Sequence, residues 1–131
     1  MKSILFDCLL VSVGGFFGAL CRFGIAGLAT RVFATPFPLG TLIANISGCF
    51  LIGLLIGSGA GEKSRHLKLA FGLGFLGALT TFSTFGAETV AQAREGSTMI
   101  AASNVILNVL LGISAVVAGI WLGSQWGQKA G

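Results

Sequence analysis

Charged residues are scarce in this chain, and three long stretches have none. Of its 131 residues only 9% are charged and 54% are hydrophobic, whereas roughly a quarter of a soluble domain is charged. The charge-free stretches are residues 32–61, 69–87 and 96–128. Each can hold the roughly 20 apolar residues that span a bilayer. This composition excludes an ordinary soluble domain and indicates a surface that faces lipid.

Residues that carry chemistry are also rare. The chain has one histidine, three cysteines and no tyrosine. The odd number of cysteines and their lack of metal-ligand spacing indicate neither a disulfide framework nor a zinc site. No nucleophile–base pair or embedded acid pair can be proposed, so we do not expect an enzyme. The net charge of +4 comes from a few basic residues in loops. The sequence has no stripe of basic residues with aromatics between them, so we expect no nucleic-acid partner.

The apolar runs predict an all-α membrane protein with four transmembrane helices. A fourth run, residues 4–29, is interrupted only by Asp7 and Arg22. We expect residues 1–131 to form a single transmembrane domain with helices at about 4–28, 39–59, 67–92 and 98–125. All the connections are short, which leaves no room for a soluble domain.

The ends of the chain give an expected topology. The N-terminal run continues past a signal-type core and contains Asp7, so we expect it to remain as the first span. With four spans, both termini and the second loop share one side. Five basic residues lie there, against two on the other: Lys2, Lys63, Arg65, Lys68 and Lys129 against Arg31 and Arg94. This bias favours a cytoplasmic N-terminus in a multi-pass protein of the inner (plasma) membrane.

Glycines recur at helical spacing. Gly14 and Gly18 are four residues apart in the first predicted helix, and Gly53 and Gly57 are four apart in the second. Small residues at this spacing let helix backbones approach closely in a membrane. We therefore expect a compact bundle with close helix contacts.

Residues 74–85 form the most unusual segment, because glycines, hydroxyl residues and phenylalanines lie in the middle of a span. These residue types weaken a helix, so the segment is either locally broken near Gly77–Thr80 or an unbroken, hydroxyl-rich packing helix. Carbonyls freed at a break could bind a cation, and a new helix N-terminus could face an anion. Phe82 and Phe85 share one helix face, either for ordinary packing or to present ring edges to an anion.

Further polar residues in the spans have two possible explanations each. Asn45 is either a helix–helix contact or an anion donor, and Asn104 and Asn108, four apart on one face, are either a donor ladder or helix glue. Arg22 either reaches the headgroups or gathers anions at a pore mouth. Glu88 is either an interfacial residue or part of a hydrogen-bond track with Thr84 and Thr81.

Three motifs resemble those of a known family. Residues 14–22, GGFFGALCR, are similar to its GGxxGAxxR signature. Residues 38–45, PLGTLIAN, resemble its P-x-GTLxxN motif. Residues 74–85, GFLGALTTFSTF, are close to its GFCGGLTTFSTF motif, and Glu88 follows in the usual place. With these motifs in order over nearly the whole chain, the sequence is identified as a member of the CrcB/Fluc fluoride channel family.

The resemblance implies an antiparallel, dual-topology homodimer with two pores and a broken third helix. It implies a structural, untransported sodium ion bound by backbone carbonyls that map to Gly77 and Thr80. Phe82 and Phe85 would line the fluoride path and Asn45 would donate to fluoride. The rest of the expected path consists of residues Arg22, Thr81, Ser83, Thr84, Glu88, Asn104 and Asn108. The expected function is passive fluoride export, which lowers cytoplasmic fluoride.

The chain departs from the family pattern at some positions. Leu76 and Ala78 stand where Cys and Gly are usual, and Asn104 and Asn108 stand where many members have Tyr and Ser. Because these asparagines keep donor capacity, we expect function to survive. Some family members form heterodimers of oppositely oriented chains, and the charge bias leaves that arrangement open here.

Two other classes of membrane protein share some of these features. A proton-coupled small multidrug exporter also has four short helices, but it needs an embedded carboxylate, and the only candidate, Asp7, looks interfacial. The two Trp near the C-terminus suit interface anchors better than a cation cage. A non-transporting scaffold would explain the glycines but not the polar third span.

Overall fold

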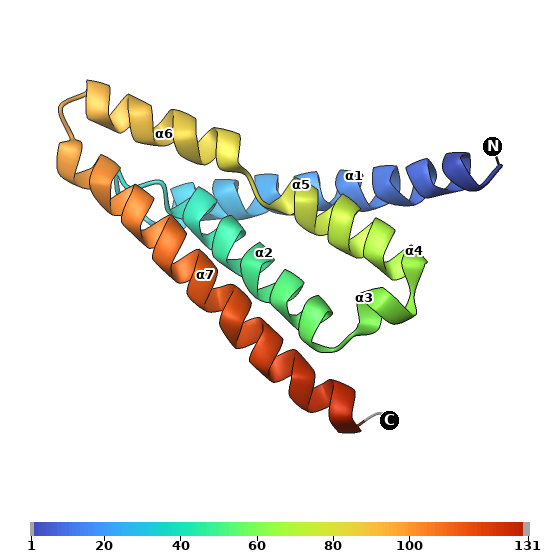
Figure 1. The fold of residues 1–131 in the computed structure, drawn as a ribbon. Coiled ribbons are helices and arrows are strands. Elements are labelled where there is room, and N and C mark those ends of the chain that lie inside the picture. Colours follow the sequence, from blue (N-terminus) through green and yellow to red (C-terminus); the bar gives the residue numbers. More distant parts are fainter. Residues whose placement is uncertain (1, 130–131) are drawn as a thin grey trace.

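The computed structural model describes residues 2–129, and the elements in that range are helical (Figure 1). In chain order they are α1 (Lys2–Val32), α2 (Leu39–Gly57), α3 (Ala60–Lys63), α4 (Arg65–Leu67), the π-helical η1 (Lys68–Leu76), α5 (Gly77–Leu79), α6 (Phe82–Arg94) and α7 (Thr98–Lys129). The short helix α3 connects the second long segment to the third, and α4 is the first turn of the third.

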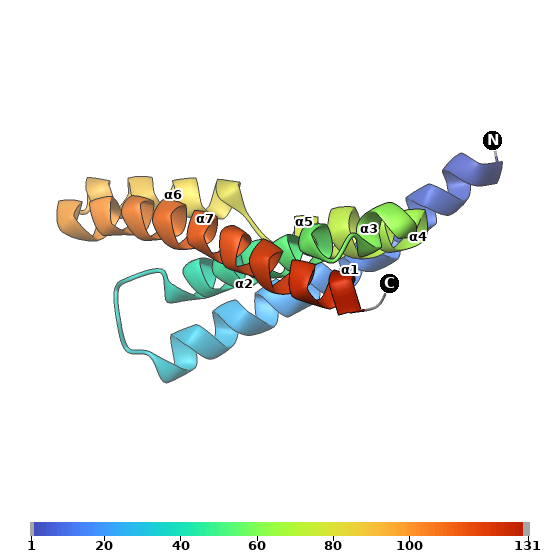
Figure 2. The same cartoon turned by 60° about the horizontal axis from the view of Figure 1, so that its bottom comes forward.

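Within the described residues, four helical stretches are long and apolar enough to cross a membrane: Ser3–Val32, Leu39–Gly57, Arg65–Arg94 and Thr98–Trp126. This confirms the expected all-helical, four-span layout. The start of α1, the end of α7, and α3 and α4 lie at one end of the molecule. The α1–α2 loop and the α6–α7 turn lie at the other (Figures 1 and 2).

Two of the helix ends have clear local causes. α1 continues to Val32, beyond the predicted residue 28, and the chain turns only at Pro36, which lacks the N–H that a continuing helix would need. The third span starts at Arg65 because the Ser64 hydroxyl accepts from Leu67 N at 3.3 Å and so caps the first turn.

The glycine pairs predicted to bring helices together do so. A Cβ on Gly14 would lie 1.9 Å from the carbonyl oxygen of Ala70, and one on Gly18 would lie 2.1 Å from that of Phe75. These contacts join α1 to η1. On the other side, α2 packs along α7, where a Cβ on Gly57 would lie 2.2 Å from Ile120 O. The prediction of close backbone contacts is confirmed.

The third span has an extended backbone step in its middle. Thr80 (φ −82°, ψ 152°) and Thr81 (φ −150°, ψ 113°) are both extended, and α6 begins at the next residue. The Thr81 hydroxyl caps α6 by accepting from Thr84 N at 3.2 Å. Gly77, which the sequence analysis placed within the irregular region, is itself helical with φ −62° and ψ −33°. This step forms an extended link between α5 and α6 (Figure 1).

Candidate functional site

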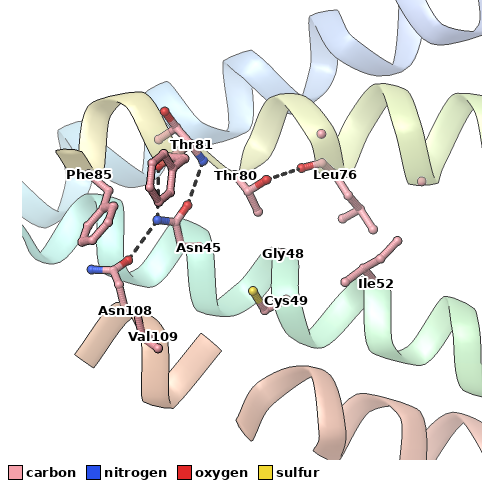
Figure 3. Close-up of a pocket in the computed structure, with 13 residues that line it drawn as sticks. Asn45, Gly48, Cys49, Ile52, Leu76, Thr80, Thr81, Phe85, Asn108 and Val109 are labelled. Atoms are coloured by element: carbon pink, nitrogen blue, oxygen red, sulfur yellow. Dashed lines mark hydrogen bonds between the residues drawn. The ribbon is translucent and has the colours of Figure 1, made fainter. Parts of the chain in front are cut away.

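The side-chain amide of Asn45 holds the extended step from the facing helix α2. Its oxygen accepts from the backbone N of Thr81 at 2.8 Å, and its nitrogen donates to the backbone oxygen of Thr81 at 3.3 Å. Figure 3 shows Asn45 facing Thr81 across the gap between the two helices. The backbone polar groups of Thr81, which no regular helix satisfies here, are thereby paired.

Two asparagines of α7 continue this polar contact. Asn45 Nδ2 also donates to Asn108 Oδ1 at 2.9 Å, and Asn108 Nδ2 donates to Asn104 Oδ1 at 2.8 Å. Asn104 is completely buried and donates to the Thr89 hydroxyl of α6 at 2.9 Å. The two α7 asparagines therefore form a ladder, and that ladder also links helices.

The two phenylalanines at the start of α6 lie together but have very different surroundings. Their ring centroids are 5.4 Å apart with a tilt of 58°. Phe85 is buried, whereas Phe82 is 83% exposed. The Phe85 ring therefore packs inside this chain, whereas the Phe82 ring lies on its surface.

Hydroxyl groups cluster at the same helix start. Thr81 Oγ1 lies 3.2 Å from Ser83 Oγ and donates to Thr84 Oγ1 at 3.0 Å. Thr81 is buried, Thr84 is half-buried and Ser83 is exposed. The cluster therefore runs from the interior to the surface of the chain.

Glu88 and Arg22 share a pocket with two residues of this cluster. Glu88 accepts from the Thr41 hydroxyl at 2.8 Å, and no hydrogen bond joins it to Thr84 within residues 2–129. Its second carboxylate oxygen is buried without a partner among those residues. A pocket of about 260 Å³ brings Glu88, Arg22, Thr41, Thr81 and Thr84 together.

A second pocket, of about 410 Å³, is lined by residues of α2, α7 and the third span (Figure 3). Its lining combines Asn45 and Asn108 with Phe82, Phe85, Gly77 and Thr80, while its remaining lining is mostly apolar. Thr81 lines both pockets. The predicted path residues therefore line two pockets that share Thr81, apart from Ser83, which contacts the Thr81 hydroxyl, and Asn104, which is buried and bonded to Asn108.

The carbonyl oxygens before the step have lost helical partners. In a continuous helix the N–H of Thr81 would pair with Gly77 O, but that N–H donates to Asn45 instead. Leu76 O remains paired with both the N–H and the hydroxyl of Thr80. Gly77 itself is exposed on the surface of this chain.

Thr41 and Thr89 are the site residues that the sequence analysis missed. Thr41 precedes Asn45 by four residues in the P-x-GTLxxN motif, and Thr89 follows Phe85 by four. That spacing, which puts each pair on one helix face, was the available signal. Residues 2–126 contain no group of three or more metal-ligating side chains.

The fold and this site define a class: a multi-pass membrane protein with a track of hydrogen-bonded polar residues between its spans. This polar track consists of Thr81, Asn45, Asn108 and Asn104. The family model described as "CrcB-like protein, Camphor Resistance (CrcB)" matches residues 9–120. The chain belongs to the CrcB family.

Curated relatives match almost the full chain, and all three described here are named "Fluoride-specific ion channel FluC". The Dehalococcoides mccartyi protein is 42% identical over 127 residues, covering 95% of this chain and 98% of the relative. The Vibrio cholerae protein is 40% identical over 92% and 94%, and a Shewanella protein is 45% identical over 86% and 92%. That name describes an ion channel, in agreement with the expectation that this chain is not an enzyme.

Proposed function

We propose that this chain forms a fluoride-selective channel that exports fluoride passively and lowers its cytoplasmic concentration. The observation that carries the proposal is the polar track around Thr81. It is supported by the family, in which the similar proteins are named fluoride-specific ion channels. Fluoride is small and strongly hydrated, so a selective path must replace its water with hydrogen-bond donors.

The donors of the proposed path are uncharged groups at the start of α6. Ser83 and Thr84 offer hydroxyls, Phe82 and Phe85 offer positive ring edges, and the N-terminus of α6 adds a favourable dipole. Asn45 supports these donors from below, because its amide pairs with the Thr81 backbone and with Asn108. Arg22 and Glu88 belong to the adjoining pocket, where the cation would attract the anion without trapping it within the narrow part.

An antiparallel homodimer is part of this proposal. Phe82, Ser83 and Gly77 lie exposed on one chain in the middle of a span. Polar groups exposed to lipid in the middle of a span are costly. The exposure of Ser83 and Gly77 therefore favours a second copy that covers this surface. Either the same chain in the opposite orientation or a paralogous chain would satisfy this geometry.

Sodium fits the oxygen atoms at the break. Gly77 O has lost its helical partner, and Thr80 is the first extended residue after α5. Uncharged carbonyl oxygens are suitable ligands for a hard monovalent cation, and two chains would double their number. We propose that Gly77 and Thr80 hold a structural sodium ion between two copies, with the third span acting as two half-helices.

The export direction and the membrane are tested in cells. In bacteria that lack their own fluoride exporter, expression of this chain in the inner membrane should lower internal fluoride and raise the tolerated external concentration. Unchanged internal fluoride with the protein present in that membrane would contradict the proposal.

A further inference from the structure

A continuous chain of hydrogen bonds leaves α6 at one residue and returns to it one turn later. Thr81 N–H donates to Asn45 Oδ1 (2.8 Å), and Asn45 Nδ2 donates to Asn108 Oδ1 (2.9 Å). Asn108 Nδ2 then donates to Asn104 Oδ1 at 2.8 Å. The return is made by Asn104 Nδ2 to Thr89 Oγ1 (2.9 Å) and Thr89 Oγ1 to Phe85 O (2.8 Å).

The direction of this chain is fixed by its two ends. A backbone N–H only donates and a backbone carbonyl only accepts, so Thr81 N–H and Phe85 O allow one polarity. An asparagine amide could otherwise turn by 180° with little change in shape. If Asn108 turned over, its NH₂ would face the NH₂ of Asn45 and its oxygen would face the oxygen of Asn104.

We propose that Asn108, Asn104 and Thr89 are positioning residues that hold the Asn45 amide in the one orientation that pairs with Thr81. In that orientation both hydrogens of Asn45 are engaged, one with Thr81 O and one with Asn108. Asn45 therefore acts on the path chiefly by fixing the extended backbone of Thr81. Asn108 of α7 acts on the Thr81 backbone through its hydrogen bond to Asn45, and Asn104 acts through its hydrogen bond to Asn108.

The position of Thr81 matters because the path residues follow directly from it. Phe82 is the next residue, the Thr81 hydroxyl contacts Ser83 and Thr84, and Thr81 lines both pockets. The release of Gly77 O also depends on Thr81 N–H pairing with Asn45. A loss of amide orientation would disturb both the anion path and the cation ligands.

Backbone hydrogen exchange at Thr81 reads the proposed positioning without any transport. Asn108→Leu keeps a similar volume but removes both links, so exchange of the Thr81 amide should be about three- to twentyfold faster, the range spanned by one interhelical hydrogen bond in a membrane. Asn108→Ser retains a group that donates and accepts and should recover most protection. Ser103→Ala, which removes a hydroxyl from the same helix outside the chain of bonds, should change nothing.

Thr89→Val provides an isosteric second variant if Asn108→Leu fails to fold. It removes the last acceptor of the amide chain, so it should also speed exchange at Thr81, eight residues away. Unchanged exchange at Thr81 in folded Asn108→Leu or Thr89→Val protein would overturn the positioning role.

The transport readout rests on the proposed function and separates the two claims. Fluoride efflux from liposomes should slow in Asn108→Leu by a factor similar to the change in exchange, with recovery in Asn108→Ser. Slower efflux with normal Thr81 exchange would overturn positioning and favour direct ion contact. Wild-type protein without fluoride efflux, but with the predicted exchange pattern, would support positioning and refute the proposed function.

Discussion

The side-chain amide of Asn45 pairs with both the N–H and the carbonyl oxygen of Thr81, although the two residues lie in different spans and 36 residues apart in sequence. The Asn45 side-chain amide thus supplies the hydrogen bonds that a continuous helix would give to the Thr81 backbone. Because the pairing occupies Thr81 N–H, it also releases Gly77 O, so the anion path and the proposed cation site depend on one contact.

Close backbone packing by α1 predicts a sharp difference between two of its glycines. Gly14→Ala would place a Cβ 1.9 Å from Ala70 O, so α1 must move away from η1. We expect a loss of about 1–3 kcal/mol of stability, measured as a lower thermal unfolding midpoint in detergent. Gly24→Ala is the matched control, because nothing lies within 4 Å of its Cβ, and alanine favours the helix. Equal midpoints for the two variants would contradict this packing.

The bond from Thr41 to Glu88 predicts a specific threonine effect. Thr41→Val removes the donor to a carboxylate whose other oxygen is already buried without a partner in the described part of the chain. We expect destabilisation of about 1–3 kcal/mol and slower fluoride efflux. Thr30→Val is the control, since the exposed Thr30 hydroxyl bonds only within its own helix at 2.9 Å. A Thr41→Val protein as stable and as active as Thr30→Val would refute the importance of this contact.

The proposed dimer predicts cross-linking at the break. In a background with Cys8, Cys21 and Cys49 replaced by alanine, Gly77→Cys should form a disulfide between two chains, because Gly77 is exposed next to the proposed symmetry axis. Leu28→Cys, an exposed position of α1 that lines neither pocket of the site, should remain monomeric on denaturing gels. Cross-linking that is equal at both positions would count against this interface.

Sodium dependence is expected if Gly77 and Thr80 bind the ion. Purified protein dialysed into a large organic cation should lose fluoride efflux and dimer stability, and added sodium should restore both. Potassium at the same ionic strength serves as the control, because a site sized for sodium should not accept it equally well. Full fluoride efflux after exhaustive sodium removal would contradict the proposed sodium site.

The spans and their glycine contacts were predictable because they depend on composition and on helical spacing. The stripe at Gly14 and Gly18 needed only the period of one helix. The contact of Asn45 with Asn108 depends on how α2 and α7 pack, and no local pattern encodes it. The extended step fell at Thr80 and Thr81, at the far edge of the expected region, because the Thr81 side chain caps α6 and Asn45 pairs its backbone. The π-helical turns of η1 had no sequence signal that we used.

The most direct test of the central claim is anion efflux from liposomes that contain the purified protein, measured with a fluoride electrode beside a chloride electrode. The account predicts fast fluoride efflux, no chloride efflux above protein-free liposomes, and loss of fluoride efflux in Phe82→Ile, which removes the exposed aromatic ring but keeps an apolar side chain. Absence of fluoride efflux from folded, dimeric wild-type protein, or equal efflux of both anions, would contradict it.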